Sequence, residues 1–468
     1  MDRIERQVYS MKTDTIAAIA TAVSNQGISI IRISGEDAFT IIDKIYRTKS
    51  GNKQLSKVES HTIHYGYIVD KDEIIDEVMV LLMRGPKSYT REDVIEIDCH
   101  GGIVVTKKIL EVVLKAGARI AEPGEFTKRA FLNGRIDLSQ AEAIGDIIHA
   151  KNEYALKNSL NQLRGNVLDK IIDIRAKVIH DIAHIEAALD DPEHMDFSEF
   201  SDEVGFNLNS NISELKKLLK SANNGRLIKE GIKTVILGKP NAGKSSLLNI
   251  LVGSDRAIVT DIAGTTRDTL EETITIGGVC LNVIDTAGIR DTEDIIEKIG
   301  IDKARRSADE ADLVIYVVDS TKELDNNDTL ILDLIKDKTT IVLLNKIDLD
   351  SVISEEDLYK YTGKDVISIS AKENTGIDKL EEWILKNFFE GKISLQDEIY
   401  ITNIRHKEAL TESIKSLEMV KDSMDSGLPE DFYSIDLMNA YEVLGKIIGE
   451  AVDEDLVNTI FREFCMGK

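Results

Sequence analysis

The sequence predicts a multidomain chain of α/β and all-α parts, with a mostly parallel α/β domain inserted into a helical domain behind an N-terminal α+β module. Three observations support this. The 468 residues are long enough for about three domains. Runs of β-forming residues alternate with helical patterns over residues 231–390. The segments on both sides of that stretch carry apolar residues at three- and four-residue spacing and almost no proline, as amphipathic helices do.

Residues 1–122 are expected to form the N-terminal module. Strands are expected at residues 15–21, 29–34, 61–69, 78–83 and 94–98, and helices at residues 37–47 and 103–115. Gly117 follows the second helical pattern, as a helix-ending glycine does. Patterned sequence begins only near Asp14, so Met1 and Met11 both stay open as the start.

The helical domain is expected in two parts, residues 123–230 and 391–468, on either side of the inserted domain at residues 231–390. Its last apolar face runs nearly to the end of the chain through Leu456, Val457, Ile460, Phe461 and Phe464. Within the inserted domain, strands are expected at residues 233–237, 279–284, 313–318, 340–344 and 366–369. Their alternation with helices predicts a parallel sheet covered on both faces.

Composition excludes several classes of protein. The chain has 58 Lys+Arg and 83 Asp+Glu, a net charge of −25, which disfavours non-specific coating of nucleic acid. Residues 1–125 hold 17 basic and 19 acidic side chains, so nearly all of the negative charge lies downstream. No run of 18 apolar residues is present, and the N-terminus lacks the apolar core of a signal peptide.

The three cysteines, Cys99, Cys280 and Cys465, are far apart in the sequence and form no CxxC pair. This spacing excludes a disulfide framework and a thiolate zinc site, and it is typical of a reducing cytoplasm. Cys99 stands beside His100. We expect Cys99 to be an ordinary residue at a strand end and not a nucleophile. The sequence therefore predicts a cytoplasmic protein.

A phosphate-binding motif follows the first strand of the inserted domain. Its residues are Gly238-Lys239-Pro240-Asn241-Ala242-Gly243-Lys244-Ser245, matching G-x-x-x-x-G-K-[ST] between a strand and a helix. Such a loop surrounds phosphates with backbone N–H groups at a helix N-terminus. Lys244 would neutralise the β- and γ-phosphates, and the Ser245 hydroxyl would bind Mg²⁺.

Three further motifs end later strands of this domain. Asp285-Thr286-Ala287-Gly288 would place a carboxylate near Mg²⁺ and a glycine N–H near the γ-phosphate. Asn345-Lys346-Ile347-Asp348 would offer guanine a carboxylate for two N–H groups that adenine lacks. Ser370-Ala371-Lys372 would offer a backbone N–H to the guanine oxygen. Because parallel strands bind ligands at their carboxyl ends, the set predicts a P-loop GTPase domain.

The groups that support hydrolysis are less evident. Ile289 stands where many small GTPases have a water-orienting glutamine. Carboxylates follow it on the same loop, Glu297 among them, although any one of them is more often plain surface. Thr266 would reach Mg²⁺, and carbonyls of the loop before it could bind a monovalent cation beside Asn241. The expected nucleotide-binding residues are Asn241, Ala242, Gly243, Lys244, Ser245, Ser246, Thr260, Asp261, Ile262, Ala263, Gly264, Thr265, Thr266, Asp285, Thr286, Ala287, Gly288, Asn345, Lys346, Asp348, Ser370 and Ala371.

The run from Gly238 to Arg290 resembles the MnmE (TrmE) family of tRNA-modification GTPases. So does the C-terminal run Phe464-Cys465-Met466-Gly467-Lys468, because this family ends in Cys-x-Gly-Lys. Further matching runs are Pro123-Gly124-Glu125-Phe126, Arg129-Ala130-Phe131-Leu132-Asn133-Gly134 and Gln140-Ala141-Glu142-Ala143-Ile144. The likeness covers nearly the whole chain after about Asp14.

The resemblance implies a homodimer formed through an N-terminal module that is similar to folate-dependent one-carbon transfer proteins. It implies joint action with a flavin-dependent partner, MnmG (GidA), which adds an aminomethyl or carboxymethylaminomethyl group to carbon 5 of the wobble uridine of certain tRNAs. It also implies activation by K⁺-dependent dimerisation of the GTPase domains, with Glu297 orienting water. The implied K⁺ ligands are Asn241, Thr260, Ile262 and Thr265. Since the chain is acidic, we expect the partner to supply much of the positive surface for tRNA.

By matched position, the resemblance implies that 5-formyl- or methylene-tetrahydrofolate is bound by Arg32, Glu96, Arg135 and Lys468. A pterin edge rich in N–H groups suits a carboxylate, and a glutamate tail suits cations. Cys465 would lie near the one-carbon unit as a catalytic group. Without the resemblance, Arg32 would be an outward strand residue and Cys465 a small apolar residue of the last helix. The loop at residues 22–27 has one glycine where the family is glycine-rich, which affects the expected shape of the pocket.

Two other functions compete with this interpretation. One is a regulatory or ribosome-assembly GTPase switch, whose usual sign is a basic RNA-binding appendage; the flanking segments here are acidic or neutral. The other is a folate-binding one-carbon transferase with a vestigial GTPase domain. The complete set of nucleotide motifs disfavours that alternative.

Overall fold

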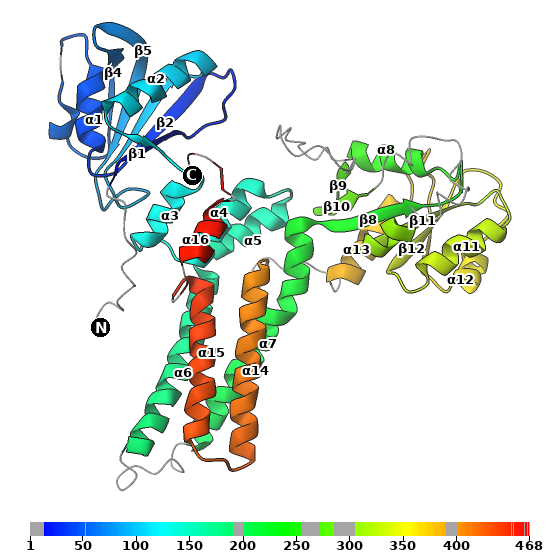
Figure 1. Ribbon diagram of the computed structural model, residues 1–468. Helices are drawn as coiled ribbons and strands as arrows, with labels where there is room; N and C mark the ends of the chain where they lie inside the picture. The colour runs from blue at the N-terminus through cyan, green and yellow to red at the C-terminus, as the bar shows by residue number, and fades with distance from the viewer. Residues whose placement is uncertain are drawn as a thin grey trace. The chain divides into compact units, whose positions relative to one another are not determined.

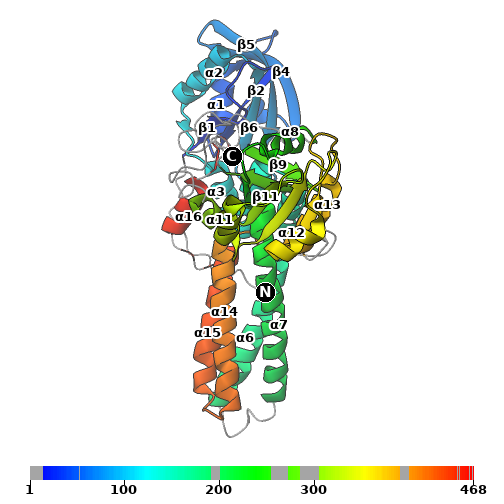
Figure 2. The same cartoon turned by 90° about the vertical axis from the view of Figure 1, so that its right-hand side faces the viewer.

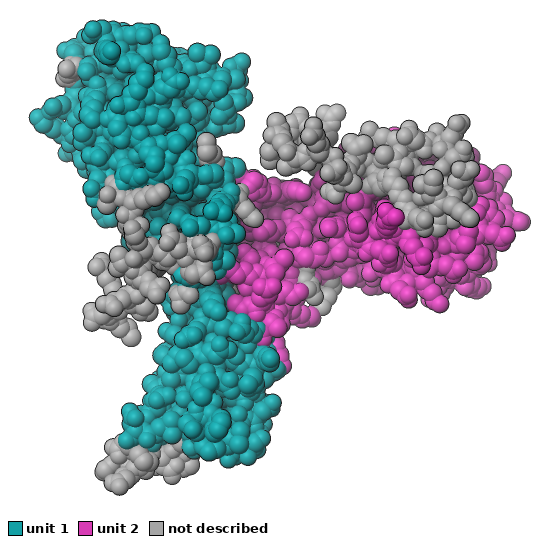
Figure 3. Space-filling model, in the orientation of Figure 1, with its two compact units in different colours: residues 1–145, 162–211, 412–468 teal, residues 146–161, 212–411 magenta. Residues whose placement is uncertain are grey.

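The structure is a computed structural model (Figure 1). It describes residues 14–51, 53–190, 201–254, 272–284, 305–389, 400–450, 452, 454–462, 464, 465 and 467. The chain forms two compact units (Figure 3): unit 1 contains residues 1–145, 162–211 and 412–468, and unit 2 contains residues 146–161 and 212–411. The four-part division of the sequence stays a prediction. Among the described helices, none has both the length and the apolar composition of a membrane span.

The N-terminal part of unit 1 is a seven-stranded sheet with two helices. The strands are β1 (Ile16–Ile19), β2 (Ile28–Ser34), β3 (Tyr46–Arg47), β4 (Thr62–Asp70), β5 (Glu73–Met83), β6 (Val94–His100) and β7 (Arg119–Ile120), in the order β3-β4-β5-β6-β2-β1-β7. All neighbours are antiparallel except β1 and β7. The helices are α1 (Ala38–Ile45) and α2 (Ile103–Ala116), and a short 3₁₀ turn spans Leu55–Lys57.

One face of this sheet packs on both helices. Along β2, Ile31 and Ile33 are fully buried in the same core as Ile41 and Ile42 of α1 and Ile109 of α2. The alternation of buried and less buried residues along β2 follows the two-residue period of a strand. Arg32 therefore lies on the face opposite α1 and α2, where its guanidinium carbon is 5.6 Å from the centre of the Phe126 ring.

The helical part of the chain contains α3 (Glu125–Leu132), α4 (Leu138–His149), α5 (Glu153–Leu163), α6 (Asn166–Asp190), α7 (Ser201–Glu230), α14 (Ile404–Asp425), α15 (Asp431–Ile448) and α16 (Glu454–Arg462). Figures 1 and 2 show α6 and α15 side by side. Ile171, Ile174 and Val178 of α6 are buried at helical spacing, which is the pattern that packs one helix against another.

The C-terminal helix α16 packs against α3. Val457 and Phe461 of α16 share a buried cluster with Ala130 and Phe131 of α3. The rings of Phe131 and Phe461 are 6.4 Å apart. This packing brings the end of the chain to the N-terminal part of unit 1.

Unit 2 contains a six-stranded sheet with helices on both faces. The strands are β8 (Ile232–Leu237), β9 (Glu272–Ile276), β10 (Val279–Val283), β11 (Leu313–Asp319), β12 (Thr340–Asn345) and β13 (Val366–Ser368), in the order β13-β12-β11-β8-β10-β9. Among the described residues, the helices around it are α8 (Lys244–Ser254), α11 (Asn326–Ile335), α12 (Glu355–Thr362) and α13 (Ile377–Phe389). The five strands predicted in this domain agree with the observed ones to within one residue at each end.

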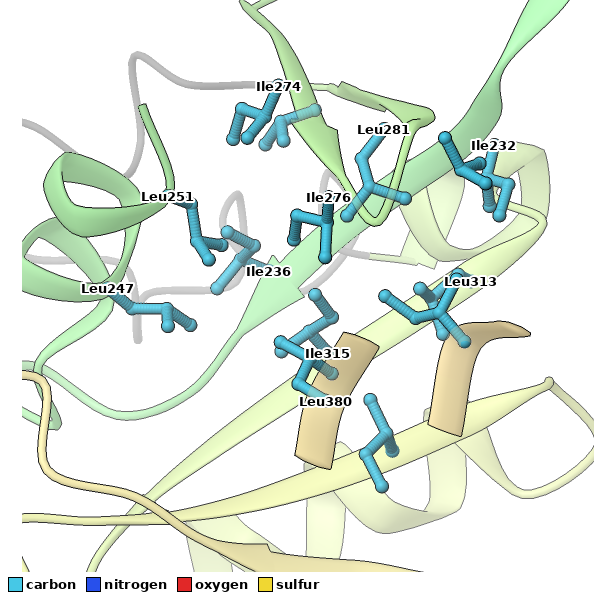
Figure 4. Close-up of a cluster of buried hydrophobic side chains, with 14 of the residues drawn as sticks. Ile232, Ile236, Leu247, Leu251, Ile274, Ile276, Leu281, Leu313, Ile315 and Leu380 are labelled. Carbon is cyan, nitrogen blue, oxygen red and sulfur yellow. The ribbon is translucent and has the colours of Figure 1, made fainter. Parts of the chain in front are cut away.

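Successive residues of β11 are buried in two different hydrophobic clusters, one on each face of the sheet. Ile315 and Val317 of β11 belong to one buried cluster (Figure 4), which includes Leu247 of α8. Val314 and Tyr316 of the same strand belong to the other. Apolar contact on both faces explains why β11 is continuously apolar, as expected for a parallel strand.

The mostly parallel sheet has one antiparallel edge. β9 pairs with β10 in antiparallel register, from Val279 opposite Ile276 to Val283 opposite Glu272. Gly277 and Gly278 join the two strands with φ of 58° and 78°, the backbone of a tight hairpin that glycine pairs favour. The other strand pairs of this sheet are parallel. The predicted fold class, mostly parallel α/β with a helical part and an N-terminal α+β module, is confirmed.

Candidate functional site

The phosphate-binding loop lies between β8 and α8. In the sheet, β8 lies between β10 and β11, so the chain continues first on one side of β8 and then on the other. Ligands usually bind at such a point in open α/β sheets. Gly238 has φ of 152° and Gly243 has φ of 99°. A Cβ atom on Gly238 would lie 2.4 Å from the Val317 carbonyl oxygen, and one on Gly243 would lie 2.1 Å from Nδ2 of Asn345. Both positions therefore require glycine, because the loop passes too close to its neighbours for a side chain.

Lys244, the first residue of α8, folds back over this loop. Its Nζ donates to the carbonyl oxygens of Gly238 at 2.8 Å and Lys239 at 2.9 Å. Burial lowers the pKa of Lys244, since desolvation disfavours its charged form. A bound phosphate would supply the missing negative charge, which makes this ammonium group suited to an anionic ligand.

Side chains outside the phosphate-binding loop also hold it in place. Lys239 Nζ donates to Asp325 at 3.1 Å and to Asp328 at 2.6 Å. Asp328 also accepts a hydrogen bond from the Tyr316 hydroxyl at 2.6 Å. Burial by itself lowers the pKa of Lys239, but the bonds to Asp328 and Asp325 outweigh it and raise that pKa. These anchors on α11 were not predicted, because the sequence does not indicate which acidic residues meet the loop.

Asn345 connects the phosphate-binding loop to the expected base-binding loops. Its Nδ2 donates to the Ala242 carbonyl oxygen at 2.9 Å, and its Oδ1 accepts from the Ala371 backbone N–H at 3.0 Å. The side chain is 1% exposed. A buried amide with both ends engaged fixes its neighbours in place, so three of the predicted residues form one hydrogen-bonded chain.

The expected guanine-binding residues meet at the ends of β12 and β13. The Ser370 hydroxyl donates to Oδ1 of Asp348 at 2.7 Å. Lys346 has φ of 69°, and its Nζ donates to Oδ2 of Asp319 at 2.6 Å. Burial raises the pKa of Asp319, but the hydrogen bond from Lys346 and those from Thr321 produce a net lowering. Asp319 was not predicted as a site residue, although its position at the end of a predicted strand could have indicated it.

A second cluster of predicted residues lies on the face of the N-terminal sheet opposite α1 and α2. Arg32 and Glu96 are directly opposite each other in β2 and β6, and Arg32 Nε donates to Glu96 Oε1 at 2.7 Å. Arg32 Nη1 also donates to the Gly467 carbonyl oxygen at 3.2 Å. The Arg32 guanidinium carbon is 5.4 Å from the centre of the Tyr89 ring. The structure therefore brings two predicted folate residues and the C-terminal tail together.

Arg135 joins this cluster from the loop after α3. Its guanidinium carbon lies 4.8 Å from the centre of the same Tyr89 ring, and the side chain is exposed. Tyr89 was missed in the sequence, where an isolated tyrosine in a loop carries no signal. Cys465 is exposed, and its carbonyl oxygen accepts from the Gly124 N–H at 3.4 Å.

Cys99 is buried. Burial raises the pKa of its thiol to about 11, so the thiolate that a nucleophile requires is scarce at neutral pH. Nδ1 of the neighbouring His100 donates to Oδ1 of Asp76 at 2.8 Å. These contacts give Cys99 the surroundings of an ordinary buried strand residue.

Several predicted residues lie outside the described residues. They are Thr260, Asp261, Ile262, Ala263, Gly264, Thr265, Thr266, Asp285, Thr286, Ala287, Gly288, Glu297 and Lys468. Of the expected cation ligands, Ser245 and Asn241 are described. Asn241 is exposed in the phosphate-binding loop with φ of 63°.

Two family models match this chain. The MnmE helical domain matches residues 138–465, and the N-terminus of the GTP-binding protein TrmE matches residues 15–135. This chain belongs to the MnmE family of tRNA modification GTPases. The tRNA modification GTPase MnmE of Lachnoclostridium phytofermentans is 66% identical over 98% of this chain and 100% of the relative. That of Acetivibrio thermocellus is 51% identical with the same coverage of both.

Among solved structures, the G domain of the FeoB iron transporter of T. maritima is similar to part of this chain. The match covers 33% of this chain and 97% of the transporter domain, with 30% identity and a TM-score of 0.26. A FeoB G domain from Methanococcus jannaschii matches with 27% identity and the same TM-score.

Proposed function

We propose that this chain is a cytoplasmic, K⁺-activated GTPase that acts with a flavin-dependent partner of the MnmG (GidA) type. Together they would add an aminomethyl or carboxymethylaminomethyl group to carbon 5 of the wobble uridine of certain tRNAs, with a one-carbon unit from folate. Membership of the MnmE family supports the tRNA substrate. The observation that carries the GTPase part is the chain of hydrogen bonds through Asn345 that joins Ala242 to Ala371.

GTP specificity in this proposal depends on Asp348. One of its oxygens is held by Ser370, and the other has no hydrogen-bond partner among the described residues. A carboxylate oriented in this way accepts the two N–H groups on one edge of guanine. Adenine lacks them and would leave the carboxylate unpaired, a steep loss of binding free energy.

The residue types expected at the phosphates suit two cations. Ser245 and Thr266 would hold Mg²⁺, and Asn241 with Thr260, Ile262 and Thr265 would hold K⁺. Hydroxyl, amide and carbonyl oxygens are the donors that such hard cations prefer. When bound, the cations neutralise negative charge on the phosphates. Lys244 would add its own positive charge, and Glu297 would orient the attacking water.

The cluster in unit 1 fits a folate. Glu96 uses Oε1 for Arg32 and has no partner for Oε2 among the described residues, so that oxygen can accept N–H groups of a pterin edge. Arg135 and Lys468 would attract the carboxylates of the glutamate tail. Folate supplies the one-carbon unit when it is bound. Cys465, on the tail that reaches Arg32, would lie beside that unit.

A homodimer is supported by the open face of the N-terminal sheet. Ile63 and Tyr65 of β4 and Met79 of β5 are exposed, and Tyr65 is directly opposite Met79 in the register of the two strands. The helices α1 and α2 pack on the other face. An exposed apolar patch of this kind favours contact with another protein surface, and we propose a second copy of this chain.

Hydrolysis of GTP by the purified full-length chain tests the proposal. We expect turnover to be at least about tenfold faster in KCl than in NaCl of equal ionic strength, because K⁺ stabilises charge that develops at the phosphates. Lys244→Ala should be inactive in both salts. Equal rates of the unaltered chain in the two salts would contradict the K⁺ assignment, and no GTP turnover in either would contradict the GTPase proposal.

A further inference from the structure

The Tyr89 ring contacts both arginines of the proposed folate site. The guanidinium carbons of Arg32 and Arg135 lie 5.4 Å and 4.8 Å from the centre of its ring. The Tyr89 hydroxyl is 2.8 Å from Oγ1 of Thr127, which is fully buried. The ring also packs beside Phe126 and its buried neighbours. Both the hydroxyl end and the edge of the ring are therefore held in place.

The two arginines differ in how their donors are used. Arg32 donates to Glu96 and to the carbonyl oxygen of Gly467, and its side chain is only 16% exposed. Arg135 is exposed, and its guanidinium has no hydrogen-bond or ion-pair partner among the described residues. The contact with Tyr89 is made with the face of a ring, which leaves the in-plane N–H donors of Arg135 available.

This difference separates the roles of the two cations. Arg32 is committed to organising the site, since it joins β2, β6 and the C-terminal tail. Arg135 is available for an incoming anion. A long side chain loses rotamer entropy when it binds a ligand, and a ring that already restrains the guanidinium reduces that loss.

We propose that Tyr89 is a positioning residue: its ring holds the Arg135 guanidinium so that the in-plane donors bind a carboxylate of the folate glutamate tail. The inference rests on the folate role proposed above. It concerns ligand affinity and not the chemistry at the one-carbon unit, since Tyr89 acts through Arg135.

Binding of 5-formyltetrahydrofolate to the full-length chain, measured by calorimetry, tests this inference. Tyr89→Leu removes the ring, and we expect binding to weaken about fivefold, the size of an exposed cation–π contact. Tyr89→Phe keeps the ring and should bind within about twofold of the unaltered chain. Tyr89→Met, which keeps most of the apolar volume beside Phe126, should match Tyr89→Leu. The unfolding temperature and the GTP turnover of each variant check that the chain is folded.

The same substitutions in a chain that also carries Arg135→Gln distinguish positioning of Arg135 from a general effect of Tyr89 on the pocket. In Arg135→Gln, we expect Tyr89→Leu to cause less than about twofold further loss, because the group on which Tyr89 acts is gone. The matching pteroate ligand, which lacks glutamate, should bind Tyr89→Leu and the unaltered chain equally.

Two results would overturn the inference: unchanged affinity in Tyr89→Leu and Tyr89→Met, or the same loss with and without Arg135. Absence of folate binding by the unaltered chain would instead contradict the proposed folate role, and the inference with it.

Discussion

Arg32 Nη1 donates to the carbonyl oxygen of Gly467 across 3.2 Å, joining a strand near the beginning of the chain to its last residues. Gly467 is buried and has φ of 89°. A Cβ atom there would lie 2.4 Å from the Ile19 carbonyl oxygen. The end of the chain can follow this path because residue 467 has no side chain. Arg32 therefore joins Glu96 to the C-terminal segment at Gly467.

Gly467→Ala should displace the tail. We expect folate affinity to fall about tenfold, because the new methyl group meets backbone at Ile19 and the Arg32 contact is lost. Calorimetry measures the affinity, and GTP turnover should stay unchanged. Gly427→Ala is the matched control, since Gly427 has φ of 64° and nothing within 4 Å of a Cβ atom. Equal folate affinity in both variants would show that the tail does not shape the pocket.

Asp348→Asn should change the base that is bound. Asparagine offers one acceptor and one donor, so it leaves a guanine N–H unpaired but can pair with xanthine, which has a carbonyl in place of the amino group. We expect GTP affinity to fall about a hundredfold and XTP to bind better than GTP, in competition against a fluorescent nucleotide. Asp350→Asn, an exposed neighbour, should keep the preference for GTP. An unaltered preference in Asp348→Asn would place guanine recognition elsewhere.

Glu297→Ala should abolish GTP turnover and leave nucleotide affinity within about threefold of normal, because a water-orienting group acts in the transition state more than in binding. Single-turnover hydrolysis and a nucleotide titration measure the two quantities separately. Glu293→Ala serves as the control on the same segment and should remain active. A large loss of affinity in Glu297→Ala would indicate a structural role.

Asp181→Asn tests the core of the helical part. Asp181 is buried on α6; burial raises its pKa to about 6, although the hydrogen bond from Asn207 and the nearby His180 oppose that rise. Because the Asp181 pKa is higher in the folded chain, its contribution to the free energy of unfolding is fully present below about pH 4. That contribution is lost as the carboxyl ionises and the pH rises through about 6.

The asparagine variant keeps an acceptor for Asn207 and carries no charge. We expect Asp181→Asn to be more stable than the unaltered chain at about pH 7.5, by on the order of 1 kcal/mol, and nearly equal at about pH 4. Urea unfolding at both pH values measures this. Asp173→Asn, an exposed change on the same helix, should show little difference at either. Destabilisation by Asp181→Asn at the higher pH would refute the assignment.

The sequence predicted the features that local pattern determines. Five strands of unit 2 were placed to within one residue at each end because a buried parallel strand is a continuous apolar run. The phosphate-binding motif lies between a strand and a helix, as its spacing indicated. The antiparallel edge strand β9 was missed, although alternating Thr273, Ile274, Thr275 and Ile276 before a glycine pair is a hairpin signal.

The contacts that complete the sites could not be predicted in the same way. Lys346 meets Asp319, and Arg135 meets Tyr89, across loops that only the folded chain brings together. Neither pair has a fixed spacing in sequence, and an isolated acidic or aromatic residue is usually plain surface or core. For Arg32 and Glu96, the family resemblance placed both in one site, and the register of β2 and β6 brings them face to face.

Mass spectrometry of tRNA wobble uridines tests the central claim most directly. Cells that lack this protein should contain the target tRNAs with unmodified carbon 5, and the unaltered chain should restore the modification. Lys244→Ala should fail to restore it, because the proposed function couples the modification to GTP hydrolysis. Full modification of carbon 5 in cells that lack the protein would contradict a role in wobble-uridine modification.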